Sequence, residues 1–220
     1  MKAAARDEVV SALAATGIVA VVRSESSENL VRLAQSLADG GVRLVEITMT
    51  VPSALHVIER AVHELGSDVV IGAGTVLDGT AARMAIAAGA GFVVGPCLCV
   101  EMIEVAHLYG VAAVPGCLSP TEIAQAWRAG ADVVKLFPGR VATPGYFRDM
   151  RGPFPQVRLM PTGNVDLDTA AEYIRAGAVA VGVGRALVDP TALQSGDWDT
   201  ISETARRFCH VIKSARGEPR

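Results

Sequence analysis

Lysine is scarce in this chain: only Lys2, Lys135 and Lys213 occur among 220 residues. The remaining 17 of the 20 basic residues are arginines dispersed along the sequence, and the formal net charge is −3. A protein that neutralises a phosphate backbone needs a basic stripe, which is absent here. The charge pattern therefore argues against nucleic acid as a partner.

Long apolar runs are also missing. No stretch of the sequence approaches the ~20 residues of a membrane span. Two acids, Asp7 and Glu8, precede any apolar stretch of signal-peptide length. We therefore expect a soluble, cytoplasmic protein without a membrane partner.

The chain lacks the residue spacings of a metal site. Its four cysteines fit no zinc motif, and the first two are expected to be buried thiols: Cys97, Cys99, Cys117 and Cys209. The four histidines fall in segments predicted to be helical, as surface or packing residues: His56, His63, His107 and His210. A metal-dependent aldolase or a His-based hydrolase needs imidazoles at strand ends, so the sequence argues against both and predicts no metal site.

Lys135 is the most informative residue because it stands alone in the apolar run Val133-Val134-Lys135-Leu136-Phe137. Burial disfavours the charged form of an amine and makes it a nucleophile near neutral pH. Neutral amines attack carbonyl carbons, which suggests Schiff-base catalysis on a keto or aldehyde substrate. The alternative is a packed stem whose ammonium reaches the surface or pairs with a carboxylate.

The chain alternates short β-branched runs with helical segments. Strands are predicted to begin near Ile18, Leu44, Val69, Phe92, Ala112, Val133, Arg158 and Ala178. Amphipathic helices are predicted over Asn29 to Ala38, Ser53 to Leu65, Ala81 to Ala88 and Thr121 to Ala129, with extra terminal helices over Asp7 to Ala15 and Ile201 to Ser214. Several helices end in a glycine suited to a left-handed C-cap: Gly41, Gly89, Gly130 and Gly177.

Eight such units, with nearly continuous Val, Ile and Leu in the strands, predict a single α/β domain over residues 1–220. We expect its parallel strands to close into an eight-stranded (β/α)8 TIM barrel. The runner-up is a doubly wound open sheet, but the Gly-x-Gly-x-x-Gly turn of that fold is missing after the first strand.

In a barrel the carboxyl ends of the strands carry the active site. Candidate residues at these ends are Arg23, Glu46, Thr75, Pro96, Lys135, Phe137, Gly163, Asn164, Gly184 and Arg185. Strands two and six face each other, so Glu46 is expected to approach Lys135 across the interior. A carboxylate there can shuttle protons for an iminium mechanism; the alternative is a buried ion pair that only fixes the core.

Several motifs occur together, in order and at characteristic separations: Gly40-Gly41-Val42, Val45-Glu46-Ile47-Thr48, Gly72-Ala73-Gly74-Thr75-Val76-Leu77, Pro115-Gly116, Val134-Lys135-Leu136-Phe137-Pro138 and Pro161-Thr162-Gly163. On these motifs the chain, from about Gly17 to Val188, resembles the 2-keto-3-deoxy-6-phosphogluconate (KDPG) and 4-hydroxy-2-oxoglutarate (KHG) aldolases. These relatives are class I aldolases of the (β/α)8 type.

The resemblance implies that Lys135 is the Schiff-base lysine and Glu46 the general acid and base. It also implies that Thr75 binds the pyruvyl carboxylate and that Phe137 lines the pocket. As alternatives, Thr75 caps the following helix and Phe137 is ordinary core. The implied partners are a small keto-acid substrate and further copies of the chain in a homotrimer, and no cofactor is implied.

Two departures from the family pattern affect the substrate. The usual arginine of the second strand is Thr50 here, so Arg23 is expected to hold the substrate carboxylate instead, unless it only forms a surface ion pair. At the distal end, Asn164 replaces a glycine and Arg185 a serine, alongside Gly163 and Gly184. Arg185, at a helix start, still favours an anion, which can be a phosphate, a carboxylate or a sulfate. The glycines can also be simple turn formers.

The predicted function is cleavage of a 2-keto-3-deoxy sugar acid, foremost KDPG, to pyruvate and glyceraldehyde 3-phosphate. The alternatives within the family are 4-hydroxy-2-oxoglutarate and 2-keto-3-deoxy-6-phosphogalactonate. More distant alternatives are a phosphate-binding isomerase or epimerase barrel, which has no need of the amine, and a non-catalytic sugar-acid sensor, which binds without a reducible adduct.

Overall fold

The computed structural model describes residues 5–217. The strands are β1 (Ile18–Val22), β2 (Leu44–Thr48), β3 (Val70–Gly74), β4 (Phe92–Val94), β5 (Ala112–Val114), β6 (Gly116–Cys117), β7 (Val134–Leu136), β8 (Leu159–Pro161) and β9 (Val181–Val183). The helices are α1 (Arg6–Thr16), α2 (Leu30–Asp39), α3 (Ala54–Leu65), α4 (Gly79–Ala87), α5 (Val100–Leu108), α6 (Pro120–Arg128), α7 (Pro144–Arg151), α8 (Leu167–Arg175), α9 (Pro190–Ser195) and α10 (Trp198–Arg216).

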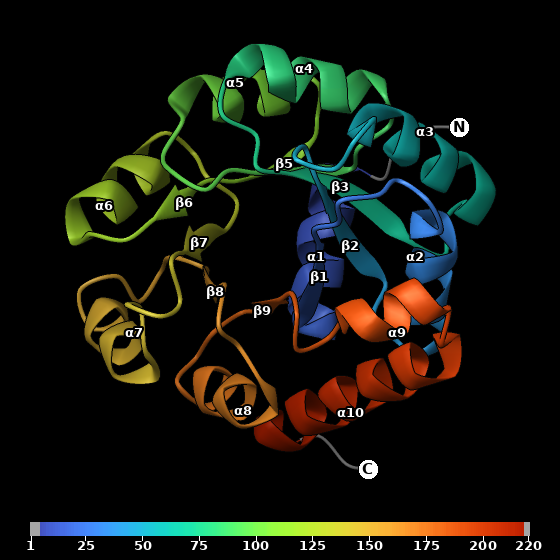
Figure 1. Cartoon of the computed structure of the whole chain (residues 1–220). Coiled ribbons are helices and arrows are strands. Elements are labelled where there is room, and N and C mark those ends of the chain that lie inside the picture. The colour runs from blue at the N-terminus through green and yellow to red at the C-terminus, as the bar shows by residue number, and fades with distance from the viewer. Residues whose placement is uncertain (1–4, 218–220) are drawn as a thin grey trace.

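The strands are parallel and form two sheets, with orders β5-β4-β3-β2-β1-β9 and β6-β7-β8. The predicted strand positions are confirmed to within about three residues, with the fifth strand divided at Pro115 into β5 and β6. Helices α2 to α8 and α10 lie outside the strands, whereas α1 lies behind them in the middle of the view (Figure 1). The expected α/β class with parallel strands is confirmed, whereas the structure divides the strands between two sheets instead of giving the single eight-stranded sheet predicted.

The turns between helices and strands follow one pattern. Gly41, Gly89, Gly130 and Gly177 all have φ between 94° and 100°, as the left-handed C-cap prediction requires. After α4, for example, Gly89 N–H donates to the Ile86 carbonyl and Ala90 N–H to that of Ala85. These bonds satisfy the last carbonyls of the helix and lead the chain straight into the next strand.

Strand side chains alternate between two buried layers. Ile18, Ala20 and Val22 of β1 belong to a large apolar cluster shared with the helices, whereas Val19 belongs to a smaller one. The smaller cluster also contains Leu44, Phe92, Val94, Ala112, Val114 and Met160 from other strands, with Val133 and Ala180 directly before β7 and β9. It therefore fills the space that the strands surround.

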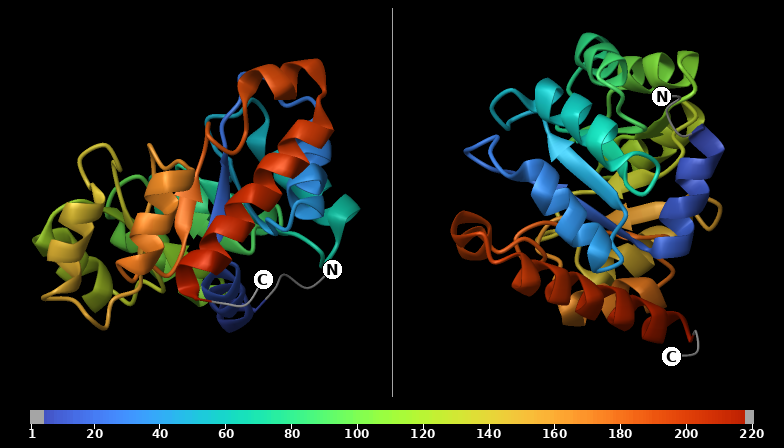
Figure 2. Two further views of the ribbon diagram at one scale, coloured as in Figure 1. Left: turned by 90° about the horizontal axis from the view of Figure 1, so that it is seen from below. Right: turned by 90° about the vertical axis from the view of Figure 1, so that its right-hand side faces the viewer.

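Helix α1 closes this inner cluster at the amino ends of the strands. Its residues Val9 and Leu13 are buried in the cluster. The left view of Figure 2 shows α1, in dark blue, below the strands and away from the loops that follow their carboxyl ends. The amino end of the interior is thus covered by apolar packing, and chemistry is confined to the carboxyl end.

None of the helices within residues 5–217 is long and apolar enough to cross a bilayer. All four cysteines are unbridged. The prediction of buried thiols is wrong for Cys97, which is exposed, whereas Cys99 is half-buried. The histidines lie in helices as predicted: His56 and His63 in α3, His107 in α5 and His210 in α10.

A polar cluster around Asp132 fastens α1 and α5 to the start of β7. The Asp132 carboxylate, in a side chain only 7% exposed, accepts hydrogen bonds from Arg6 Nε at 2.7 Å and from Ala113 N–H at 2.9 Å. His107 Nε2 lies 3.2 Å from Asp132 Oδ2, the same oxygen that accepts from the Ala113 N–H. Because Arg6 belongs to α1, this carboxylate ties the helix to the strands that it covers.

We predict that Asp132→Ala lowers the free energy of unfolding by about 2–3 kcal/mol, because it leaves the Ala113 N–H without a partner and removes the charge that holds Arg6. Urea unfolding measures this change. Glu203→Ala is a matched control, since it removes an exposed ion pair with Arg206 (2.8 Å) and is expected to cost less than about 0.5 kcal/mol. Equal effects of the two substitutions would contradict a structural role for Asp132.

Candidate active site

Lys135 and Glu46 meet on the inner face of the strands. Their neighbours Val134 and Val45 belong to the outer layer, so alternation turns both charged side chains inward. Lys135 Nζ lies 4.0 Å from Glu46 Oε1, and the two side chains are 7% and 1% exposed. The expected approach of these residues across the interior is therefore present in the structure.

The Glu46 carboxyl is electrostatically unusual. Neither of its oxygens has a hydrogen-bond partner within the described residues, and both are buried. Burial raises the pKa of this carboxyl above 4.5, and the nearby charges of Lys135 and Arg23 only partly oppose the effect. A carboxyl of this kind takes up and releases a proton closer to neutral pH than an exposed glutamate does.

Glycines provide the space for this pair. β2 and β3 pair with Glu46 opposite Gly72 and Thr48 opposite Gly74. A Cβ at position 74 would overlap the Glu46 carboxylate, and a Cβ at position 72 would overlap the Phe92 ring. Gly74 therefore leaves room for the carboxylate, and Gly72 for the Phe92 ring, inside an otherwise filled interior.

Phe137 lies against the amine. Lys135 Nζ is 5.2 Å from the centroid of the Phe137 ring. The same ring packs against Gly163, where a Cβ would lie 3.4 Å from it. Phe137 is half-buried, so its ring forms a wall beside the amine, and it is not an ordinary core residue.

Thr75 directly follows β3, and Pro96 lies two residues after β4. Thr75 has φ 59°, a left-handed conformation that is strained for a β-branched residue and that occurs mainly where function requires it. The alternative interpretation of Thr75 as a helix cap is wrong, because Asp78 caps α4 by accepting a hydrogen bond from Ala81 N–H. The half-buried Pro96 packs its backbone against Gly116, the residue of β6 that pairs with Lys135.

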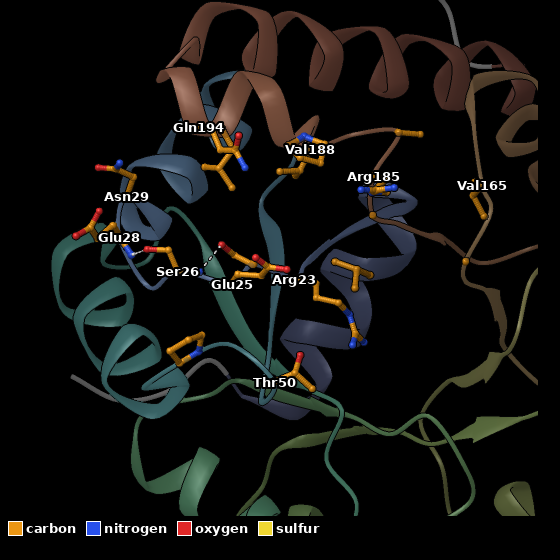
Figure 3. Close-up of a pocket in the computed structure, with 18 of the residues that line it drawn as sticks. Arg23, Glu25, Ser26, Glu28, Asn29, Thr50, Val165, Arg185, Val188 and Gln194 are labelled. Carbon is orange, nitrogen blue, oxygen red and sulfur yellow. Dashed lines mark hydrogen bonds between the residues drawn. The ribbon is translucent and has the colours of Figure 1, made fainter.

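A cavity of about 1290 Å³ opens at the carboxyl ends of β1 and β9. It is lined by five of the predicted site residues, namely Arg23, Gly163, Asn164, Gly184 and Arg185, and not by Thr75, Pro96, Phe137, Lys135 or Glu46. Figure 3 shows Arg23 between Thr50 and Arg185. The Arg23 charge also acts on Glu46, so the cavity and the buried pair are electrostatically connected.

The distal loops keep the backbone shape of a glycine-rich turn. Gly163 has φ 90° and Asn164 φ 55°, and asparagine is one of the few other residues that adopt the left-handed region readily. Arg185 is exposed in a turn before α9, whose first amides, on Thr191 and Ala192, already donate to Asp189. The expected helix start therefore has its first amides already occupied, and the exposed Arg185 side chain lies in the turn before it.

Sequence reasoning missed part of the cavity wall. Glu25 follows β1 and Gln194 lies on α9, and both line the cavity although neither stands directly at a strand end. Thr50, noted only as a departure, lines it too, and its hydroxyl lies 2.9 Å from that of the buried Thr48. Within the described residues, no group of three or more His, Cys, Asp or Glu side chains is arranged to hold a metal ion.

Comparison with known proteins gives consistent matches. The family described as KDPG and KHG aldolase matches residues 9–204. The 2-dehydro-3-deoxy-phosphogluconate aldolase of Treponema pallidum (strain Nichols) is 32% identical over 205 residues, which cover 93% of this chain and 97% of the relative. That of Pseudomonas aeruginosa PAO1 is 34% identical over 190 residues, covering 86% of each.

Among solved structures, the KDPG aldolase of Legionella pneumophila, with pyruvate captured at low pH as a covalent carbinolamine intermediate, superimposes with a TM-score of 0.83. The two sequences are 27% identical, and the match covers 90% of this chain and 96% of that one.

We predict that the Glu46 carboxyl titrates with a midpoint above 4.5, which NMR of ¹³C-labelled glutamate measures, with Glu46→Gln identifying the signal. A raised folded-state pKa means that the group stabilises the fold below its unfolded pKa and loses this contribution as the pH rises through the folded value. As the pH rises from 4.5, the free energy of unfolding of the native protein should therefore fall relative to that of Glu46→Gln. A midpoint at or below 4.5 would contradict the desolvated environment.

Proposed function

This chain belongs to the KDPG and KHG aldolase family, and we propose that Lys135 and Glu46 are the catalytic residues of its reaction. The protein is a class I pyruvate aldolase, a lyase that cleaves 2-keto-3-deoxy-6-phosphogluconate to pyruvate and glyceraldehyde 3-phosphate. The observation that carries the residue assignment is the buried pair itself. An amine and a carboxyl of raised pKa lie 4.0 Å apart, and Arg23 of the cavity wall acts electrostatically on the carboxyl.

The chemistry follows from these two groups. Lys135 Nζ attacks the C2 ketone, and Glu46 donates the proton with which the carbinolamine loses water to form an iminium. Glu46 then accepts the proton of the C4 hydroxyl while the C3–C4 bond breaks, and the bonding electrons pass into the iminium to give an enamine. Protonation at C3 and hydrolysis release pyruvate. The iminium serves as the electron sink, so the mechanism needs neither a metal nor an organic cofactor.

The cavity residues bind the two ends of the substrate. We assign the C1 carboxylate to Arg23, with Thr75, Pro96 and Phe137 enclosing the pyruvyl portion. The distal phosphate is assigned to the loop amides of Gly163, Asn164 and Gly184 and to the Arg185 guanidinium; these four residues line the cavity. For the alternative substrates 4-hydroxy-2-oxoglutarate and 2-keto-3-deoxy-6-phosphogalactonate, analysis of the aldehyde product provides the distinction.

We further propose that the two sheets form one (β/α)8 barrel domain over residues 1–220. Pro115 alone separates β5 from β6, and Thr162, which follows β8, forms a parallel bridge with Gly182 of β9. These two connections join the sheets at both edges. The inner cluster with its α1 cover supports the same arrangement.

A homotrimer and a cytoplasmic location complete the proposal. Large apolar side chains are exposed on and beside α4 and α5, namely Leu77, Met84, Val100, Leu108 and Tyr109. Exposed apolar side chains on neighbouring helices support contact between copies of the chain. The cytoplasmic location is proposed because the substrate and products are small charged metabolites.

Borohydride reduction in the presence of pyruvate should leave a stable adduct on Lys135, identified by peptide mass spectrometry. Lys135→Ala should show none, whereas Lys213→Ala, which removes an exposed lysine of α10, should retain it. We expect Glu46→Gln to slow turnover by roughly 10²–10⁴-fold, since it removes the proton carrier. A folded native protein without any adduct would refute the Schiff-base mechanism.

Arg23→Ala should lower kcat/KM for the cleavage of KDPG by about 10–100-fold, because a charge-assisted bidentate contact is lost. Introducing Thr50→Arg into this variant should restore much of the loss, since it supplies a guanidinium from the neighbouring strand. Arg140→Ala is the charge-matched control, because Arg140 is exposed and lies outside the cavity lining. If Arg23→Ala behaved like Arg140→Ala, Arg23 would not be the carboxylate ligand.

A further inference from the structure

Thr48 places a hydroxyl group deep in the wall of the site. Its side chain is fully buried at the last position of β2, on the same inner face of the strand as Glu46. Within residues 5–217, the only hydrogen-bond partner of this hydroxyl is that of Thr50, at 2.9 Å. Neither threonine takes part in the proposed mechanism, so the pair needs an explanation of its own.

The burial of Thr48 decides which of the two hydroxyls is the donor. If Thr50 donated to Thr48, the Thr48 proton would be buried without an acceptor, which is unfavourable. If Thr48 donates instead, its proton is used and the Thr50 proton stays free. Thr50 is exposed and lines the cavity. The pair therefore offers the cavity a hydroxyl donor whose oxygen already accepts a hydrogen bond.

The backbone after β2 holds Thr50 in place for this bond. Val51 N–H donates to the Thr48 carbonyl at 2.9 Å, which closes a turn around Thr50. Met49 N–H donates to the Gly74 carbonyl at 2.7 Å, and this bond ties the same turn to β3. The backbone thus fixes the position of Thr50, and the buried Thr48 hydroxyl fixes the direction of its side chain.

Arg23 lies beside the threonine pair. β1 and β2 pair Val22 with Ile47, so the residues that follow, Arg23 and Thr48, stand next to each other at the carboxyl ends of the two strands. Arg23 and Thr50 both line the cavity, on neighbouring segments of the chain (Figure 3). A guanidinium and a hydroxyl proton are both donors, and two donors side by side suit an anionic group.

The place of the pair along β2 indicates which part of the substrate reaches it. Thr48 is the next inward-facing residue after Glu46 in the direction of the cavity, and Glu46 lies 4.0 Å from Lys135 Nζ. In the proposed mechanism Lys135 bonds to C2 of a keto acid. The anionic group attached to C2 is the C1 carboxylate, whose two oxygens have lone pairs for more donors than one guanidinium supplies.

We propose that Thr50 is a second ligand of the C1 carboxylate, beside Arg23, and that Thr48 is a positioning residue that directs the Thr50 hydroxyl toward it. This inference rests on the proposed function, because the carboxylate reaches this wall only when Lys135 reacts with a keto acid. The carboxylate is then held by a charged donor that follows β1 and by a neutral donor that follows β2.

The test measures the pyruvate concentration that gives a half-maximal borohydride adduct on Lys135. Thr50→Val should raise this concentration about five- to tenfold, because a hydrogen bond to a charged group is lost, and Thr48→Val about threefold. Thr50→Ser and Thr48→Ser keep the hydroxyls and should stay within about twofold of the native protein. Thr204→Val is the matched control and should change nothing, since its hydroxyl donates to the Thr200 carbonyl outside the cavity lining.

The double variant Thr48→Val/Thr50→Val separates positioning from direct binding. Because Thr48 acts through Thr50, the double variant should match Thr50→Val alone within about twofold. If the two single effects multiplied instead, Thr48 would act independently and the positioning role would be overturned. An unchanged half-saturating concentration in Thr50→Val, with adduct still formed, would overturn Thr50 as a ligand and leave the proposed function intact. Absence of any adduct in the native protein would refute the proposed function itself.

Discussion

The site depends on a carboxyl group that is buried without a hydrogen-bond partner. Glu46 is surrounded by strand side chains, and its two oxygens receive no donor from the described residues. An ionised carboxylate in such a place is costly, and only the nearby charges of Lys135 and Arg23 reduce that cost. The raised pKa therefore keeps the carboxyl protonated to a higher pH than an exposed glutamate, which suits a group that must both donate and accept protons in one reaction.

The rest of the interior is arranged around that carboxyl. Gly74 leaves the space in which it lies, and the inner apolar cluster with α1 keeps water from the amino end. Asp132 occupies the opposite end of the same interior, where Arg6, His107 and Ala113 all contact its carboxylate. One buried carboxyl thus has several hydrogen-bond donors, whereas the other has none and a raised pKa, and the difference lies in the donors around each.

Much of this arrangement was predictable from local sequence patterns. Strand starts, glycine C-caps and the approach of Glu46 to Lys135 follow from hydrophobic alternation and from the parallel topology. The division into two sheets was not, because it depends on the break at Pro115 and on weak pairing of β8 with β9. The strained Thr75 backbone could not be predicted either, since a threonine after a strand equally predicts a helix cap. Asp78 fills that role in the structure.

The cavity wall shows why substrate selection is harder to predict than chemistry. Catalytic groups must lie at strand ends, whereas groups that contact the distal part of a substrate can come from any loop that reaches the opening. Glu25 and Gln194 reach it from the loop after β1 and from α9, which are far apart in sequence and distinguished by no motif. A change of substrate class therefore requires no change in the strands, and the departures from the family pattern at Thr50, Asn164 and Arg185 are confined to this outer layer while Lys135 and Glu46 are retained.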